Sequence, residues 1–66
     1  MKITVNGTEH LCAENARVSD LLVQLELVGR RVAVERNGDI VPRSLHGSVA
    51  LAEGDQIEIV VAVGGG

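Results

Sequence analysis

The sequence contains no aromatic residue, since Phe, Tyr and Trp are all absent from its 66 residues. Without these rings, the chain lacks the stacking surfaces on which proteins commonly hold single-stranded nucleic acid. Basic residues are also scarce, because six Lys and Arg stand against nine Asp and Glu, for a formal net charge of −3. Proteins that bind nucleic acid through its phosphates have the opposite balance. We therefore expect no nucleic-acid partner.

Cysteine and long apolar runs are equally rare. The single cysteine, Cys12, cannot form an internal disulfide, which excludes a small secreted scaffold held by bridges and favours a reducing compartment. No stretch approaches the roughly 20 apolar residues that span a bilayer. The sequence opens with strand-like alternation rather than a signal peptide. We expect a cytoplasmic protein without a membrane anchor.

The usual motifs of enzymes and metal sites are also missing. The sequence has no Ser-His-Asp set with an oxyanion motif, no Cys-His cluster at metal spacing and no glycine-rich phosphate loop. His10 and Cys12 share one face of a predicted strand, and core packing is their better interpretation because free cysteine is usually buried. His46 has no recognisable companion, and Arg30 and Arg31 are interpreted as a solvated pair. We expect no catalytic residue and no metal site.

What the chain does contain is a clear hairpin at its start. Apolar and polar residues alternate over residues 1–5, and Asn6-Gly7 is a strong signal for a two-residue turn. The return strand covers residues 8–12. This register places Leu11 on the outer face, beside Lys2.

An amphipathic helix follows over residues 18–28. Asn15 or Ser19 is expected to cap its start, Asp20 suits its positive end, and Gly29 is expected to stop it after about three turns. Five apolar residues recur at helical spacing and form the stripe that faces the core: Val18, Leu21, Leu22, Leu25 and Val28.

A second hairpin is predicted from residues 32–34, the turn Asn37-Gly38 and residues 40–41. An irregular stretch over residues 43–54 then leads to the last strand.

The last strand is predicted over residues 56–63, with its odd-numbered residues facing the helix. Three acidic residues around this strand are expected to lie on a solvated rim: Glu53, Asp55 and Glu58. The order of elements predicts an α+β fold in which one main helix packs on a mixed sheet, with the last strand beside the first. On the opposite face, Leu11, Val60 and Ala62 are predicted to form a partly apolar surface for docking a partner.

The three glycines at the end of the sequence, Gly64, Gly65 and Gly66, are its most unusual feature. At average usage, three glycines at a given place arise by chance in roughly 3 of 10,000 chains. An inert tail is one interpretation. The other is functional, because glycine can thread a narrow channel and leave its carboxyl carbon open to attack. We predict a folded domain over residues 1–63 and a flexible glycine tail over residues 64–66.

Several segments together carry a resemblance to a known family. They are the opening residues 1–7, Val18-x-x-Leu21-Leu22, residues 32–37, Ile40-Val41-Pro42-Arg43, and Glu53-Gly54-Asp55 before a strand that ends in glycines. The whole chain resembles the ubiquitin-like β-grasp sulfur carriers, and most closely the ThiS family of thiamine biosynthesis. The Ile-Val-Pro-Arg run and the glycines are its most specific parts. The family needs only two glycines, so Gly64 is expected to be a spacer. Pro42 and Arg43 either dock partners or shape their loop.

The resemblance implies a protein co-substrate rather than an enzyme. A ThiF-type adenylyltransferase would use ATP and Mg²⁺ to adenylate Gly66, with Gly65 keeping the channel clear, and a cysteine desulfurase would supply sulfur. The resulting thiocarboxylate would donate its sulfur to a ThiG-type thiazole synthase. The chain itself would bind no cofactor. The alternatives are a carrier for molybdopterin synthesis, a noncovalent β-grasp module and a ubiquitin-like modifier of lysines.

Overall fold

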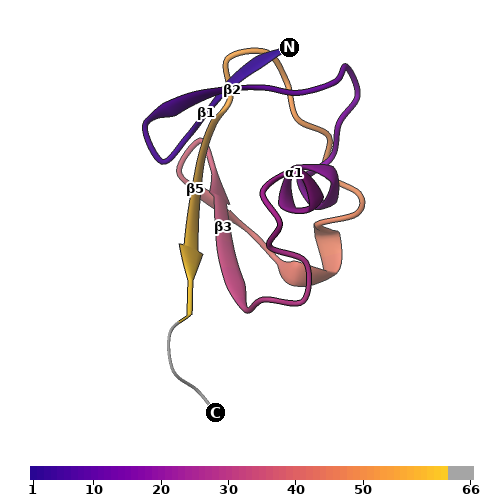
Figure 1. The fold of residues 1–66 in the computed structure, drawn as a ribbon, viewed down its shortest axis with the longest axis vertical. Helices are drawn as coiled ribbons and strands as arrows, with labels where there is room; N and C mark the ends of the chain where they lie inside the picture. The colour runs from indigo at the N-terminus through magenta and orange to yellow at the C-terminus, as the bar shows by residue number, and fades with distance from the viewer. Residues whose placement is uncertain (63–66) are drawn as a thin grey trace.

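Five short strands and one helix make up the computed structural model, which describes residues 1–62 (Figure 1). A single turn of 3-10 helix, η1, precedes the last strand. The elements in chain order are β1 (Lys2–Val5), β2 (Thr8–Leu11), α1 (Val18–Gln24), β3 (Val32–Arg36), β4 (Asp39–Val41), η1 (Arg43–Leu45) and β5 (Gln56–Val61).

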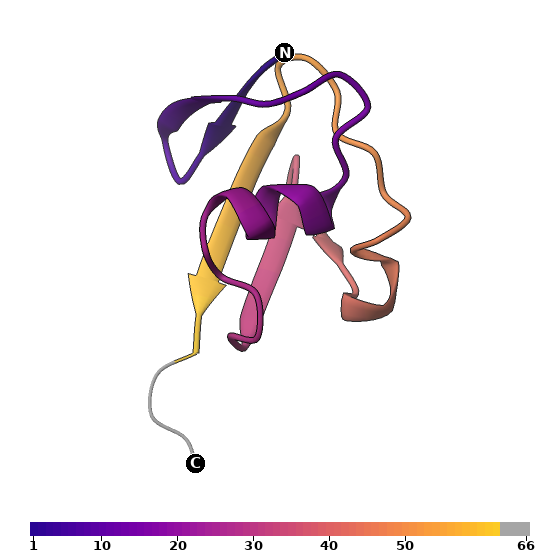
Figure 2. The same ribbon diagram turned by 45° about the vertical axis from the view of Figure 1, so that its right-hand side comes forward.

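The strands form one mixed sheet in the order β2-β1-β5-β3-β4. β5 lies at its centre, parallel to β1 and antiparallel to β3. Helix α1 crosses one face of the sheet, in front of β5 and β3 in Figure 2, and leaves the other face open. This arrangement confirms the predicted α+β, ubiquitin-like β-grasp fold, including the position of the last strand beside the first.

Both hairpins have the predicted Asn-Gly turns. Asn6 and Gly7 have φ values of 50° and 84°, and Asn37 and Gly38 have 52° and 88°. These positive values at both turn positions are typical of type I′ turns, which match the twist of the flanking strands. The first turn sets the register in which Leu11 pairs with Lys2, as predicted.

Helix α1 is shorter than predicted, and Gly29 does not end it. The Leu27 backbone N–H donates to the Leu22 carbonyl at 2.8 Å, and Glu26 has a φ of 59°. Together these features form a Schellman motif, in which a residue in the left-handed region closes the helix. Val28 therefore lies beyond the helix and is 69% exposed, so the prediction that it faces the core was wrong.

The start of α1 also differs from the prediction. Arg17, rather than Asn15 or Ser19, is the N-cap residue. Its backbone N–H donates to Oδ2 of Asp20 at 2.8 Å. The Asp20 carboxylate thus satisfies a backbone donor at the first turn, which is the half of a capping box that an acidic residue at this position supplies.

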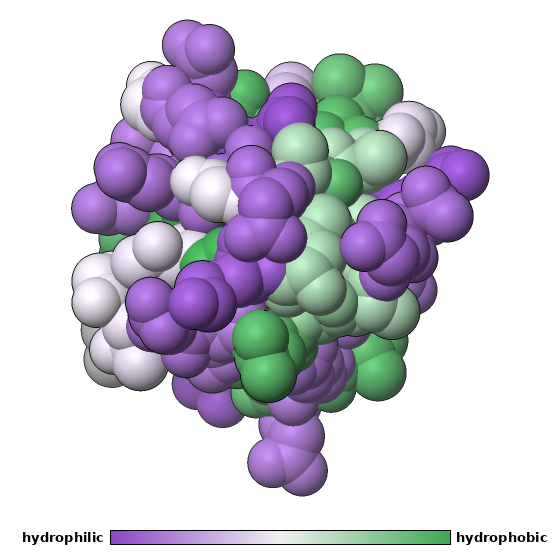
Figure 3. All heavy atoms as spheres, turned by 90° about the horizontal axis from the view of Figure 1, so that it is seen from above, coloured by the Kyte–Doolittle hydropathy of each residue, from purple (hydrophilic) through white to green (hydrophobic). Residues whose placement is uncertain are grey.

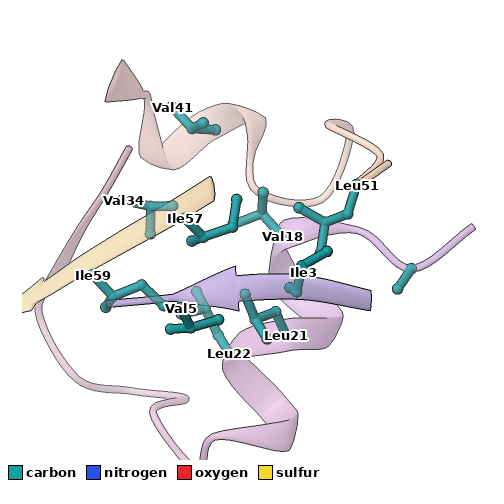
Figure 4. Packing of buried hydrophobic residues seen from close by; sticks show 11 residues of the cluster. Ile3, Val5, Val18, Leu21, Leu22, Val34, Val41, Leu51, Ile57 and Ile59 are labelled. Atoms are coloured by element: carbon teal, nitrogen blue, oxygen red, sulfur yellow. The ribbon is translucent and has the colours of Figure 1, made fainter. Parts of the chain in front are cut away.

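The core lies between α1 and the covered face of the sheet. Side chains from the helix, from β1 and from β5 meet there, and residues from β3, β4 and the loop before β5 close its margins (Figure 4). All of its members are aliphatic, as the absence of aromatic residues requires: Ile3, Val5, Ala16, Val18, Leu21, Leu22, Val34, Val41, Leu51, Ile57 and Ile59.

No helix within residues 1–62 is long and apolar enough to cross a membrane.

Candidate functional site

Strand β5 leads the chain out of the core towards its glycine run. Ile57 and Ile59 are buried under α1, while Val60 points to the open face. Pairing continues one residue beyond the strand, because the Ala62 N–H donates to the Arg31 carbonyl at 2.8 Å. The predicted strand residue Val63 and the predicted tail, Gly64, Gly65 and Gly66, lie outside the described residues.

The side chain of Asn6 holds β5 close to its end. The Ile59 N–H donates to Asn6 Oδ1 at 2.8 Å, and Asn6 Nδ2 donates to the Ile59 carbonyl at 3.1 Å. The Asn6 backbone N–H also donates to the Ile57 carbonyl at 2.9 Å. Because β1 ends at Val5, the amide of Asn6 takes the place of a further backbone partner. The sequence indicated the turn at Asn6 but gave no sign of this second role.

Asp55 fixes the start of β5, and it is buried rather than part of a solvated rim. Its side chain is 6% exposed and accepts three hydrogen bonds. Arg36 Nε and the Ala52 N–H donate to Oδ2 at 2.7 and 2.8 Å, and Asn37 Nδ2 donates to Oδ1 at 3.0 Å. Burial alone would raise the pKa of Asp55, but these donors outweigh burial and hold the pKa below its usual value. The prediction was wrong because no periodicity distinguishes this aspartate from the exposed Glu53 and Glu58.

The predicted docking residues Leu11, Val60 and Ala62 all lie exposed, but they do not form one patch. Leu11 is 71% exposed and Val60 is 65% exposed. Leu11 pairs with Lys2 at the start of β1, whereas Val60 lies near the end of β5 and pairs with Ala33. Standard strand spacings place them about 20 Å apart.

Further exposed apolar side chains on this face of the sheet come from the other hairpin, where Ala33 is paired with Val60. Ile40 in β4 is 73% exposed and pairs with Glu35, which in turn faces Glu58 across β3 and β5. We call the surface formed by Ala33, Ile40, Val60 and Ala62 the open-face patch. Ile40 was not among the predicted docking residues, although its alternation with the buried Val41 was a signal for an exposed position.

An acidic hollow borders the open-face patch. It has a volume of about 460 Å³ and lies between the two Asn-Gly turns, with Thr4, Glu35 and Glu58 among its lining residues. The Glu35 and Glu58 side chains are directly opposite on neighbouring strands, and neither forms an ion pair with another residue of the described range. The open face therefore combines aliphatic side chains with unneutralised negative charge.

Pro42 and Arg43 follow β4, and Arg43 lies away from the open face. Pro42 precedes η1, and its carbonyl accepts the Leu45 N–H at 2.8 Å. The exposed Arg43 lines a groove on the helix side of the molecule, together with Arg30 and His46. The structure thus separates the predicted docking residues onto two surfaces.

His46 is buried in the loop before β5, and Cys12 lies against the core. His46 is 9% exposed, and its Nε2 lies 3.1 Å from the Val41 carbonyl. Cys12 is partly buried and packs against the core, as predicted. Among the described residues, no three His, Cys, Asp or Glu side chains lie close enough to hold a metal ion.

The end of the molecule near the N terminus has a mixed surface. Figure 3 views this end from above and shows a green band of hydrophobic atoms between hydrophilic, purple regions.

Comparisons with known proteins cover the entire chain. A family model described as the ThiS family matches residues 3–66. The thiazole synthase of Paramagnetospirillum magneticum is 46% identical over 66 residues, and the sulfur carrier protein ThiS of Bacillus subtilis is 40% identical over 53 residues. The match covers 100% of this chain and 20% of the thiazole synthase, against 80% of both this chain and the Bacillus protein. The chain thus spans about a fifth of the length of the thiazole synthase that it matches.

A solved structure of a ThiS protein is similar to the whole chain. The crystal structure of the thiamine biosynthesis protein (ThiS) from Geobacter metallireducens matches with a TM-score of 0.84 and 33% identity, and the match covers 100% of both chains.

Proposed function

Because the chain belongs to the ThiS family, we propose that it carries sulfur for the synthesis of the thiazole ring of thiamine. The observation that carries this proposal is the extent of the family match, which continues to residue 66 and so includes all three glycines. The position of β5 supports it, because the central strand of a fixed sheet leads directly to the glycine run.

The first proposed step activates the carboxylate of Gly66. A carboxylate is a poor electrophile, so a ThiF-type adenylyltransferase with ATP and Mg²⁺ joins it to AMP and releases pyrophosphate. The absence of a side chain on Gly65 and Gly66 leaves the acyl carbon accessible within the enzyme. Gly64 acts as a spacer between this end and the folded domain. Nucleotide and metal belong to the partner enzyme, and this chain supplies only the acyl group.

The second proposed step exchanges oxygen for sulfur. The terminal sulfur of a cysteine-desulfurase persulfide attacks the acyl carbon, and AMP leaves with the bonding electrons. A thiol then reduces the acyl disulfide and releases the Gly66 thiocarboxylate. Thiazole synthase takes sulfur from this group. The name of the relative from Paramagnetospirillum supports this acceptor, because that thiazole synthase includes a segment similar to the whole chain.

Recognition by the adenylyltransferase is assigned to the open-face patch. Val60 lies in β5 and Ala62 directly follows this strand, so a partner that covers them is also close to the segment that leads to the glycines. Val60 and Ile40 are 65% and 73% exposed, and their burial would contribute to association. Leu11, about 20 Å away by strand spacing, would meet a separate part of the partner surface.

The proposal is tested by loading the purified chain. The chain is incubated with ATP, Mg²⁺, a ThiF-type adenylyltransferase, a cysteine desulfurase, cysteine and a thiol, and its intact mass is measured. We expect the mass change for exchange of one oxygen for one sulfur, located at Gly66 by fragmentation. A chain that forms neither adenylate nor thiocarboxylate would contradict the proposal.

Three variants separate the chemistry from the fold. Deletion of Gly65 and Gly66 is expected to abolish loading and to leave the thermal unfolding temperature nearly unchanged, because the buried core lies elsewhere. Gly64→Ala is expected to load with sulfur at the wild-type rate, whereas Gly65→Ala is expected to load slowly.

A growth experiment assigns the pathway. If a strain that lacks the gene for this chain grows only when thiazole is supplied, the chain serves thiamine synthesis rather than molybdopterin synthesis.

A further inference from the structure

A groove on the helix side of the molecule is not used by the chemistry at Gly66. It has a volume of about 310 Å³ and lies between the last turn of α1, the loop after it and η1. Residues from all three segments line it. A protein bound in this groove would leave the open-face patch free.

The floor and rim of the groove are aliphatic. Leu22 and Leu27 join it to the core, and Val23 and Val28 stand on its rim. Val23 is 62% exposed and Val28 is 69% exposed, so two large apolar side chains meet solvent beside one hollow. Isolated exposed aliphatic residues are common, but a group of them around a hollow is typical of a binding surface.

The charge around the groove is positive, although the whole chain carries a net charge of −3. Arg30 reaches it from the loop after α1, and Arg43 reaches it from η1. Both arginines are exposed, and neither forms an ion pair with another residue between 1 and 62. No Asp or Glu is among the described residues that line the groove.

Backbone hydrogen bonds hold the walls of the groove in place. The Leu27 N–H donates to the Leu22 carbonyl at 2.8 Å, and the Arg30 N–H donates to the Leu27 carbonyl at 3.0 Å. On the other wall, the His46 carbonyl accepts the Ser19 N–H at 2.8 Å, which ties the end of η1 to α1. A preformed surface of this kind loses little conformational entropy when a partner binds.

We propose that this groove docks an acidic, aliphatic segment of a partner protein. The segment places an aliphatic side chain between Val23 and Val28, and flanking Asp or Glu carboxylates pair with Arg30 and Arg43. Such complementarity gives both specificity and faster association. This inference rests on the proposed function in one respect, because it takes the partner from the two enzymes that handle the carrier: the adenylyltransferase and thiazole synthase.

Binding measurements on charge-reversal variants test this inference. The affinities of the wild-type chain, Arg30→Glu and Arg43→Glu are measured by calorimetry with each enzyme. Arg31→Glu is the matched control, because Arg31 is exposed, lies beside Arg30 and does not line the groove, yet it gives the same change in net charge. With at least one enzyme, we expect the groove variants to bind about tenfold more weakly, and the control to change by less than about threefold.

Further measurements separate the possible outcomes. Val28→Ser, which removes apolar surface without a change in charge, is expected to weaken binding of the same enzyme. Added salt is expected to reduce the difference in affinity between wild type and Arg43→Glu. Equal effects of Arg31→Glu and Arg43→Glu on both enzymes would overturn the groove assignment. Failure of the proposed function looks different, because the wild-type chain would then bind an enzyme without gaining sulfur.

Discussion

The two Asn-Gly turns have the same dipeptide and nearly the same backbone, but they hold β5 in different ways. Asn6 and Asn37 have φ values of 50° and 52°. The Asn6 amide pairs with both backbone groups of Ile59, near the end of β5. The Asn37 amide accepts the Gln56 N–H at 2.9 Å and donates to Asp55 at 3.0 Å, both at the beginning of β5.

The difference lies in what each asparagine is joined to. Asn37 belongs to a charged network with Asp55 and Arg36, in which removal of one member leaves buried groups without partners. Asn6 forms two hydrogen bonds between uncharged groups, its own side-chain amide and the backbone of Ile59, just after β1 has ended. Besides its backbone pairing with β3, β5 is therefore held at its start by a charged network and nearer its end by the neutral amide of Asn6.

The largest effect is expected from the charged network. Asp55→Ala removes the acceptor for Arg36, Asn37 and the Ala52 N–H, and we expect it to lower the free energy of unfolding by about 3 kcal/mol. Urea unfolding followed by circular dichroism measures this loss. Asp39→Ala is the control, because Asp39 is an exposed aspartate in the same hairpin. Equal losses in the two variants would show that Asp55 does not hold the start of β5.

A smaller loss of unfolding free energy is expected when the side chain of Asn6 is removed. Asn6→Gly keeps the left-handed turn but removes two hydrogen bonds to Ile59, for an expected cost of about 1–2 kcal/mol. Amide hydrogen exchange should accelerate at Ile59 and remain slow at Gln56. Asn37→Gly is the matched variant and should give the reverse pattern. If both variants accelerated both amides equally, the two turns would not act on separate parts of the strand.

The sequence was sufficient to predict the strands, the place of the last strand beside the first and both turns, because alternation and Asn-Gly dipeptides are local signals. The end of α1 was predicted wrongly at Gly29, since Glu26 adopts a left-handed conformation that non-glycine residues seldom take. Local propensity favoured a helix end at glycine, but the helix closes earlier, where the Leu27 N–H forms a hydrogen bond with the Leu22 carbonyl.

The site was less predictable than the fold. The glycine run was evident as a pattern, but the clamp at Asn6 joins residues 53 positions apart and leaves no local trace. The same holds for the burial of Asp55, whose donors include Arg36, 19 residues away. Exposed residues such as Ile40 and Val60 come onto one face of the sheet only through the pairing of β3 with β4 and β5.

Acid should weaken the start of β5 before its end. The donors around Asp55 hold its folded-state pKa below the value in the unfolded chain, so its stabilising effect is complete above the unfolded pKa of about 3.9 and is lost as the pH falls through the lower, folded value. The difference in unfolding free energy between wild type and Asp55→Asn should therefore be constant near neutral pH and shrink in acid. The corresponding difference for Asn6→Gly should not depend on pH. A constant difference for Asp55→Asn would contradict the assigned role of its charge.

The smallest effect, and the only gain in stability, is expected in the middle of β5, between the residues that Asn37 and Asn6 contact. Glu35 and Glu58 lie directly opposite each other on β3 and β5, and like charges in this position are destabilising. Glu58→Gln should raise the unfolding free energy by about 0.5 kcal/mol at low salt, with a smaller gain at high salt. Glu14→Gln, at an exposed loop residue, gives the same change in net charge and should have little effect. Equal gains would mean that total charge, rather than the facing pair, limits stability. A gain confined to Glu58→Gln would show that the open face keeps an unfavourable charge pair beside the strand that leads to the glycines, where a basic group of a partner could neutralise it.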